Sequence, residues 1–235
     1  MKRFLIFIAL LLASITLQAG ELVFHWNKMC ENKIFDMEFM PDNDYFVIVT
    51  ANEFQVRRTE DGEIVKTYPK NLSYKEHDID FSNDSTKLIL SYGNKIEVRN
   101  VKDFSIIKEY TLTADTNGLS YEFDEIAIDT KRPYLYAAIT KTVEIPPYGW
   151  VSNRRIMIYN YETMEEIGEL IPSKTDTYTK KYIAISSDGK YLSVINQGTS
   201  YITTFDLTTQ KEIQSFKVCD GYDDGSSGIP VSIKF

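Results

Sequence analysis

Between residues 34 and 235 the chain alternates short apolar runs with polar turns, and the runs recur in groups of four. The clearest group contains an alternating run at residues 182–185, a turn at 187–190, and further runs at 191–195, 201–205 and 212–216. A two-residue alternation predicts β-strands, and turn-forming residues between such runs predict antiparallel hairpins. This stretch therefore predicts one four-stranded antiparallel sheet.

The same order of runs recurs upstream, at a nearly constant distance. Each group opens with an alternating strand whose last apolar residue precedes a polar turn; these residues are Phe39, Phe81, Ile128, Ile185 and Phe235, at spacings of 42, 47, 57 and 50. The second run of each group is the most apolar, which is typical of a strand buried on both faces, and the fourth is the most polar, as in an outer edge strand. A four-stranded unit at this period predicts an all-β fold, a β-propeller of four-stranded antiparallel blades. The expected blades span residues 34–70, 76–112, 121–171 and 181–217, with one further first strand at 229–235.

The fourth group resembles the WD40-like and YVTN-type repeats of bacterial β-propellers, and the likeness extends more loosely over most of residues 34–235. The residues that carry it are Ile183-Ala184-Ile185, Ser187-Asp188-Gly189-Lys190-Tyr191-Leu192, Val194-Ile195-Asn196, Phe205-Asp206-Leu207 and Thr209-Gln210-Lys211-Glu212-Ile213. The pattern departs from WD40 repeats because no Gly-His pair precedes the first strand and no Trp-Asp closes the third. The resemblance implies a propeller fold and says almost nothing about activity.

Four blades and one strand do not make a familiar closed ring, and exposed sheet edges have to be covered. Three interpretations stay open. The sequence is a fragment of a longer propeller, or residues 231–235 complete a blade begun by residues 21–26, or a second chain covers the edges.

The first 19 residues have the three parts of a secretory signal peptide: positive Lys2 and Arg3, an apolar run at 4–13, and a small-residue cleavage site before Gly20. The propeller domain is then residues 20–235, and the protein is expected to be secreted or periplasmic. No later stretch is apolar enough to span a bilayer.

Loss of Lys2 and Arg3 takes the formal net charge from -8 to -10, which disfavours nucleic acid as a partner. Cys30 and Cys219 lack the spacing of a zinc site, and export leaves two alternatives, a disulfide between them or two free thiols.

An insertion at residues 142–155 makes the third group the longest, and we expect it to form a loop on one face of the propeller. Its Tyr148 and Trp150 offer large amphipathic surfaces, and Arg154 and Arg155 offer hydrogen-bond donors. Such residues on a loop of a rigid scaffold are typical of a ligand-binding site. The alternative is that Trp150 folds back and packs against the blade.

No sequence motif of a catalytic or cofactor site is present, and His25 and His77 cannot be brought together from the sequence. Residues 220–228 carry closely spaced carboxylates and glycines, but their spacing does not match a calcium loop and favours a solvated connection. We expect no cofactor and no metal. The many tyrosines fall mostly at strand positions, where packing explains them.

The preferred function is an exported, non-catalytic binding or scaffold module that meets a protein or cell-surface ligand with one propeller face. The alternative is the propeller part of an exported enzyme, a lyase or glycan-active hydrolase with an acidic channel. First-strand residues such as Asp36, Asp80 and Asp129 would point into that channel, although turn formation and blade packing explain them equally well.

Overall fold

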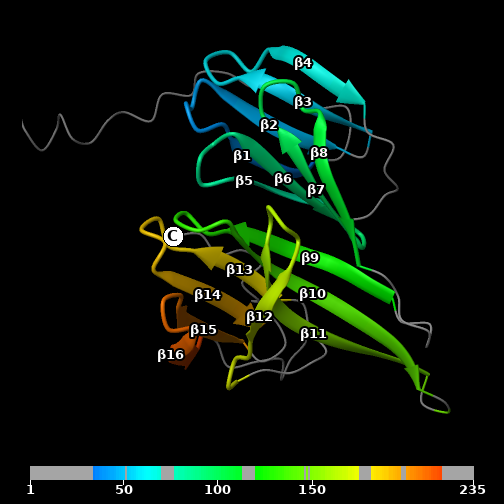
Figure 1. Cartoon of the computed structure of the whole chain (residues 1–235), viewed down its shortest axis with the longest axis vertical. Helices are drawn as coiled ribbons and strands as arrows, with labels where there is room; N and C mark the ends of the chain where they lie inside the picture. The colour runs from blue at the N-terminus through cyan, green and yellow to red at the C-terminus, as the bar shows by residue number, and fades with distance from the viewer. Residues whose placement is uncertain are drawn as a thin grey trace, which may run out of the picture.

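The computed structural model describes residues 34–50, 52–69, 77–112, 120–145, 147, 149–174, 181–196 and 200–218, and these residues form four separate four-stranded antiparallel sheets (Figure 1). In every sheet the strands follow one another in sequence order, joined as successive hairpins. The first sheet comprises β1 (Ile34–Phe39), β2 (Tyr45–Thr50), β3 (Glu53–Arg58) and β4 (Ile64–Pro69). The second comprises β5 (His77–Phe81), β6 (Lys87–Tyr92), β7 (Lys95–Asn100) and β8 (Ile106–Thr111). The third comprises β9 (Ser120–Ile128), β10 (Tyr134–Ile145), β11 (Gly149–Asn160) and β12 (Glu166–Leu170). The fourth comprises β13 (Lys181–Ile185), β14 (Tyr191–Asn196), β15 (Tyr201–Asp206) and β16 (Lys211–Lys217).

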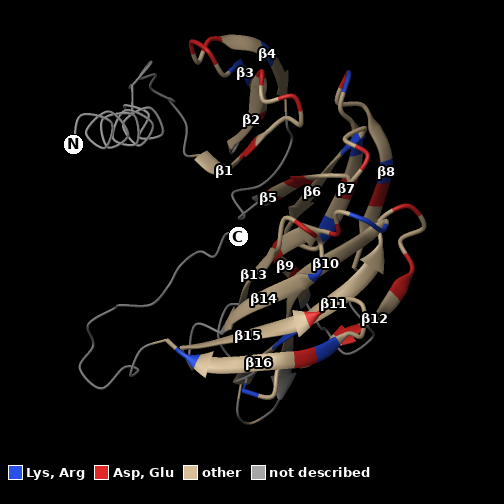
Figure 2. Cartoon of the chain, turned by 90° about the vertical axis from the view of Figure 1, so that its left-hand side faces the viewer, with Lys and Arg blue, Asp and Glu red and all other residues tan. Residues whose placement is uncertain are grey.

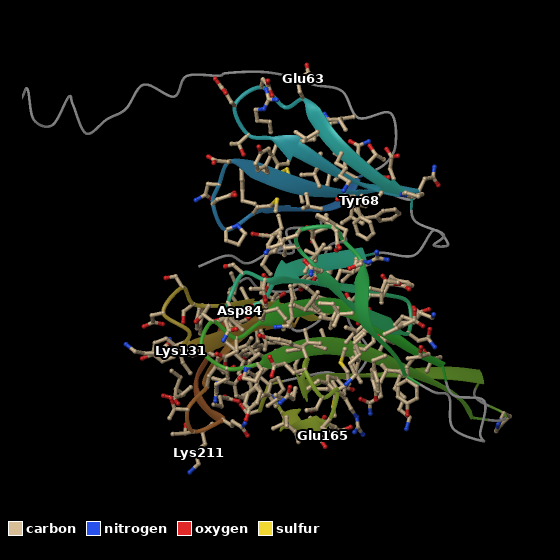
Figure 3. All side chains as sticks on the ribbon, turned by 45° about the horizontal axis from the view of Figure 1, so that its top comes forward. Glu63, Tyr68, Asp84, Lys131, Glu165 and Lys211 are labelled. Atoms are coloured by element: carbon tan, nitrogen blue, oxygen red, sulfur yellow. The ribbon has the colours of Figure 1, made fainter. Side chains whose placement is uncertain are left out.

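The sheets pack in chain order through their first strands. Strand β5 contacts β1 on one side and β9 on the other, and β9 in turn contacts β13. Apolar clusters fill the space between consecutive sheets, and in the first of them Tyr68 of β4 stacks on Phe104 at 4.5 Å between ring centroids (Figure 3). The all-β class is thus confirmed, and the arrangement is propeller-like, although the described strands do not close into a ring.

Packing on both faces explains why the second strands are the most apolar. Along β6, Leu88 and Leu90 pack against the first sheet, whereas Ile89 between them packs against the third. Because successive strand residues point to opposite faces, a sheet held between two neighbours needs apolar residues at every position. The fourth strands end the sheets on the outside, and most residues of β4 are exposed.

The turns between first and second strands use side-chain hydrogen bonds and left-handed backbone conformations. The Ser186 hydroxyl donates to Asp188 Oδ1 at 2.8 Å and accepts the Tyr191 N–H at 3.0 Å, and Ser82 does the same in the second sheet. Gly189 has φ +64°, so the tight turn expected there is confirmed.

The expectation of a loop at residues 142–155 is wrong, because most of these residues extend a hairpin. Strands β10 and β11 pair continuously from Tyr134 opposite Asn160 to Ile145 opposite Gly149. The alternation of Thr142, Val143, Glu144 and Ile145 continues the strand period, so β10 runs to Ile145 and β11 begins at Gly149.

Several features of the sequence lie outside the described residues. They are the expected signal peptide, His25, Cys30, Tyr148, Cys219, the acidic segment 220–228 and the expected strand at 229–235. Among the described residues no helix is long and apolar enough to cross a membrane.

Candidate functional site: an acidic cavity along the inner strands

A cavity of about 540 Å³ runs along the first strands of all four sheets. Its acidic lining residues are Asp36 and Glu38 from β1, Asp78 and Asp80 from β5, Glu125 from β9, and Asp129 just after β9. Figure 2 shows acidic residues on these inner strands in red. Residues two apart on a strand share a face, so Asp78 and Asp80 come to the same side, as do Asp36 and Glu38.

The carboxylates of the inner strands bind the backbone of the next sheet. Each accepts a hydrogen bond from a main-chain N–H of the following inner strand. The pairs are Asp36 with Ile79 at 2.8 Å, Asp78 with Ile126 at 2.5 Å, Asp80 with Ile128 at 2.8 Å and Glu125 with Ile183 at 2.8 Å. The first strand of a sheet has an edge with unpaired N–H groups, and a buried N–H without a partner is costly. These side chains therefore act as bridges that join the four sheets along the cavity.

Burial and mutual repulsion shift the protonation of the carboxyls on β5. Loss of hydration raises the pKa of Asp78 well above its usual range, and the charge of Asp36, a hydrogen bond with Asp36 and the charge of Glu125 raise it further. Loss of hydration also raises the pKa of Asp80 to about 7, although the Ile128 and Phe81 N–H groups favour its charged form. Asp36 and Asp78 thus lie close together across the junction of the first and second sheets, and this proximity favours the protonated form of Asp78.

Asp129 serves the turn after β9. Its side chain is fully buried, accepts N–H groups of Lys131 at 2.8 Å and Arg132 at 3.0 Å, and forms an ion pair with the Arg132 guanidinium at 2.6 Å. Arg132 also donates to the Leu207 carbonyl at 3.0 Å, which ties this turn to the fourth sheet. Of the interpretations given for Asp129 from the sequence, the structure supports turn formation and packing between sheets.

The residues predicted to bind a ligand near the insertion do not form one cluster. Trp150 lies in β11 opposite Glu144, and its side chain, like all of Tyr148, is outside the described part. Arg154 is half-buried and donates to Thr140 Oγ1 at 2.9 Å, with Asp124 3.5 Å away. Its neighbour Arg155 points to the other face of the strand and lies 3.4 Å from Glu169.

The sequence reasoning missed Glu38, Asp78 and Glu125. The signal was present for Asp78, because it stands two residues before Asp80 in an alternating strand and therefore shares its face. For Glu125 the signal was its place in the repeat, because it stands three residues before Ile128, as Asp36 and Asp78 stand three residues before Phe39 and Phe81. Its partner, a backbone N–H of the fourth sheet 58 residues away, could not be read from the sequence. Within the described ranges, no group of three or more His, Cys, Asp or Glu residues is arranged to hold a metal ion.

The fold and the cavity together define a propeller-like all-β protein whose inner strands are joined by carboxylates. No protein-family model matches the chain, and no curated protein matches it either. Among solved structures, a chain of Kuenenia stuttgartiensis hydrazine synthase is similar, with a TM-score of 0.57 and 16% sequence identity over 84% of this chain and 51% of that chain. The present chain spans about half the length of that structure, and a likeness at this identity shows the fold alone.

Proposed function

We propose that the chain is an exported, non-catalytic binding or scaffold module that meets a protein or cell-surface ligand with the end of the β10–β11 hairpin. The observation that carries the proposal is the length of this hairpin. Both strands have 12 residues, whereas the equivalent strands of the other sheets have six. The hairpin extends beyond the rest of its sheet (Figure 1).

The outer part of the hairpin has few strand neighbours within the described chain. Pairing of β9 with β10 ends at Ser120 opposite Thr142, and pairing of β12 with β11 ends at Leu170 opposite Ile156. A two-stranded extension of this kind adds little to a core, yet it presents whatever lies at its turn on a rigid support.

The residues around the turn suit recognition. Tyr148 and Trp150 are of the types that carry most binding energy at interfaces, and Pro146 and Pro147 restrict the backbone between the strands. A restricted turn loses less conformational entropy on binding, which favours affinity. Arg154 is held by Thr140 and Asp124, so its role in this proposal is to hold the base of the hairpin.

The test replaces Tyr148 and Trp150 with Ala together in the full chain, followed by formaldehyde cross-linking in the native cell envelope and purification of the chain. We expect recovery of the cross-linked partner to fall at least tenfold, with an unchanged unfolding midpoint. The control variant Ile213→Ala/Phe216→Ala removes exposed apolar surface from β16 and is expected to recover the partner normally. Equal recovery with the hairpin variant, or no partner with the unmodified chain, would contradict the proposal.

A second candidate function is an exported glycan-active hydrolase or lyase, favoured by the hydrogen-bonded Asp36 and Asp78 carboxyls in the cavity. A carboxyl whose pKa is raised by burial is the usual form of a general acid. The binding module is preferred because Asp36 and Asp78 also accept backbone N–H groups that join the sheets. Cleavage of soluble polysaccharides that Asp78→Asn abolishes, in a protein that remains folded, would reverse this preference.

A further inference from the structure

A second hollow, distinct from the acidic cavity, lies between the second and third sheets. Its volume is about 210 Å³. Tyr110 of β8 forms one wall, and Tyr121 of β9, Lys141 of β10, Tyr159 of β11 and Glu166 of β12 line the side of the third sheet. We call these five residues and the space between them the tyrosine groove.

Strand pairing places these side chains together. Tyr121 is directly opposite Lys141 in the β9–β10 ladder, and Tyr159 is directly opposite Glu166 in the β11–β12 ladder. The Tyr159 ring packs against Tyr110 across the junction, with 6.0 Å between ring centroids. The groove is therefore built by the four strands of the third sheet and closed by β8, the outer edge strand of the second sheet.

The Tyr159 hydroxyl is the unusual feature of this groove. Its side chain is only 2% exposed and lines the hollow. No described residue bonds to its hydroxyl, and this oxygen is not among the buried atoms that lack a partner, so it is open to the hollow. The comparably buried Tyr161 donates to Asn83 Oδ1 at 3.0 Å, and Tyr92 donates to Glu97 Oε1 at 2.5 Å. Because the Tyr159 hydroxyl opens into the hollow and no described residue holds it, it is available to bond a polar ligand there.

Two charged residues of the groove, Lys141 and Glu166, are also free to bind a ligand. Lys141 Nζ lies over the Tyr121 ring at 5.5 Å from the centroid and forms no ion pair with a described carboxylate, and Glu166 forms none with a described cation. Arg155 also lines the hollow, but it is paired with Glu169 at 3.4 Å. The groove thus offers one cationic donor, one anionic acceptor and three phenol groups, with no net charge.

We propose that the tyrosine groove binds a single hexose-sized sugar ring. The ring carbons of a sugar present an apolar face that packs on tyrosine, and each sugar hydroxyl both donates and accepts hydrogen bonds. A donor and an acceptor on opposite sides of an aromatic groove match that chemistry, whereas a purely apolar ligand would leave Lys141, Glu166 and the Tyr159 hydroxyl unpaired. The volume is below the range of about 300–1,000 Å³ found for drug-sized ligands, so the groove accommodates one ring and not an oligosaccharide.

The test is saturation-transfer NMR of the full chain with glucose, galactose, mannose and N-acetylglucosamine, each offered separately, followed by titration of those that bind. We expect saturable binding of at least one sugar through its ring protons. Tyr159→Phe removes only the hydroxyl and is expected to weaken that binding at least fivefold without lowering the unfolding midpoint, because no described residue bonds to the hydroxyl.

The matched control is Tyr161→Phe, which removes a buried hydroxyl two residues away that has a partner. It should lower the unfolding midpoint and leave the sugar affinity unchanged. Binding of none of the four sugars, or equal affinity in Tyr159→Phe and the unmodified chain, would overturn the proposal; so would binding of glycine or alanine in the groove in place of a sugar.

This inference is independent of the proposed hairpin function. Tyr148→Ala/Trp150→Ala should bind the sugar as the unmodified chain does, because neither residue lines the groove. Loss of partner recovery in that variant, with sugar binding retained, would separate the two sites.

Discussion

The burial of the Asp80 carboxyl predicts that the protein loses stability as the pH rises toward neutrality. Asp80 Oδ2 accepts the Ile128 N–H at 2.8 Å, and Oδ1 accepts the Phe81 N–H at 2.7 Å. Despite these donors, burial and the charges of Glu38 and Asp36 raise its pKa to about 7, whereas the unfolded chain has the usual value of 3.8. The folded state therefore holds this proton more tightly than the unfolded state does.

The direction and size of the effect follow from proton linkage. Below about pH 4 both states are protonated, and the contribution of Asp80 to stability is fully present. Between about pH 4 and pH 7 the unfolded state is ionised while the folded state keeps its proton, so the free energy of unfolding falls with pH and levels off above 7. From pH 5 to pH 8 this amounts to about 2 to 3 kcal/mol, an upper value because the side chain is only partly buried.

The assay is urea unfolding of the full chain at pH 5, 6, 7 and 8. Asp80→Asn cannot ionise. We therefore expect the free energy of unfolding of this variant to fall less between pH 5 and pH 8 than that of the unmodified chain. The control is Asp188→Asn. Asp188 is exposed, and hydrogen bonds from Ser186 and Lys190 hold its pKa at about 2, so it does not titrate in this range.

Two results would refute the reasoning. One is a free energy of unfolding that stays constant or rises from pH 5 to pH 8 in the unmodified chain. The other is a pH dependence of Asp80→Asn that equals that of the unmodified chain and of Asp188→Asn.

Two further predictions concern the turns between the first and second strands of the third and fourth sheets. Gly189→Ala is expected to destabilise the protein by about 2 kcal/mol or more, because φ is +64° and the new Cβ would overlap the Thr130 hydroxyl. In the Thr130→Ala background only the cost of the left-handed backbone remains, about 1 kcal/mol. An equal loss in both backgrounds, measured by urea unfolding, would exclude the clash. Asp129→Asn is expected to cost about 2 kcal/mol because it breaks the ion pair between a fully buried carboxylate and the partly exposed Arg132. The exposed-pair control Asp61→Asn should stay within about 1 kcal/mol, and similar costs for the two would contradict the role of carboxylate burial.

Much of the fold was predictable from local patterns. The two-residue alternation placed the strands, and turn formers such as Gly189 placed the hairpins between them. The apolar character of both faces of β6 correctly indicated a sheet held between two neighbours. These features depend only on residues that are near one another along the chain.

The prediction of a loop failed for residues 142–155 because of an assumption about strand length. Val143 and Ile145 continue the alternation of β10, yet a strand of 12 residues exceeds the length of its equivalents in the other sheets. The two-residue alternation predicted the end of the strand better than the expected strand length did. Backbone pairing continues as long as the residues of both strands are compatible with an extended conformation.

The sequence by itself determined that the chain forms antiparallel four-stranded sheets with apolar middle strands and polar outer ones. Only the tertiary structure decided what the acidic residues of the inner strands do. Asp36, Asp78 and Glu125 meet backbone N–H groups of sheets that lie 43, 48 and 58 residues further along the chain. The raised pKa of Asp78 and the open hydroxyl of Tyr159 are likewise set by the junctions between sheets. A local pattern fixes which side of a strand a residue occupies, but what it meets there depends on the packing of sheets that are distant in sequence.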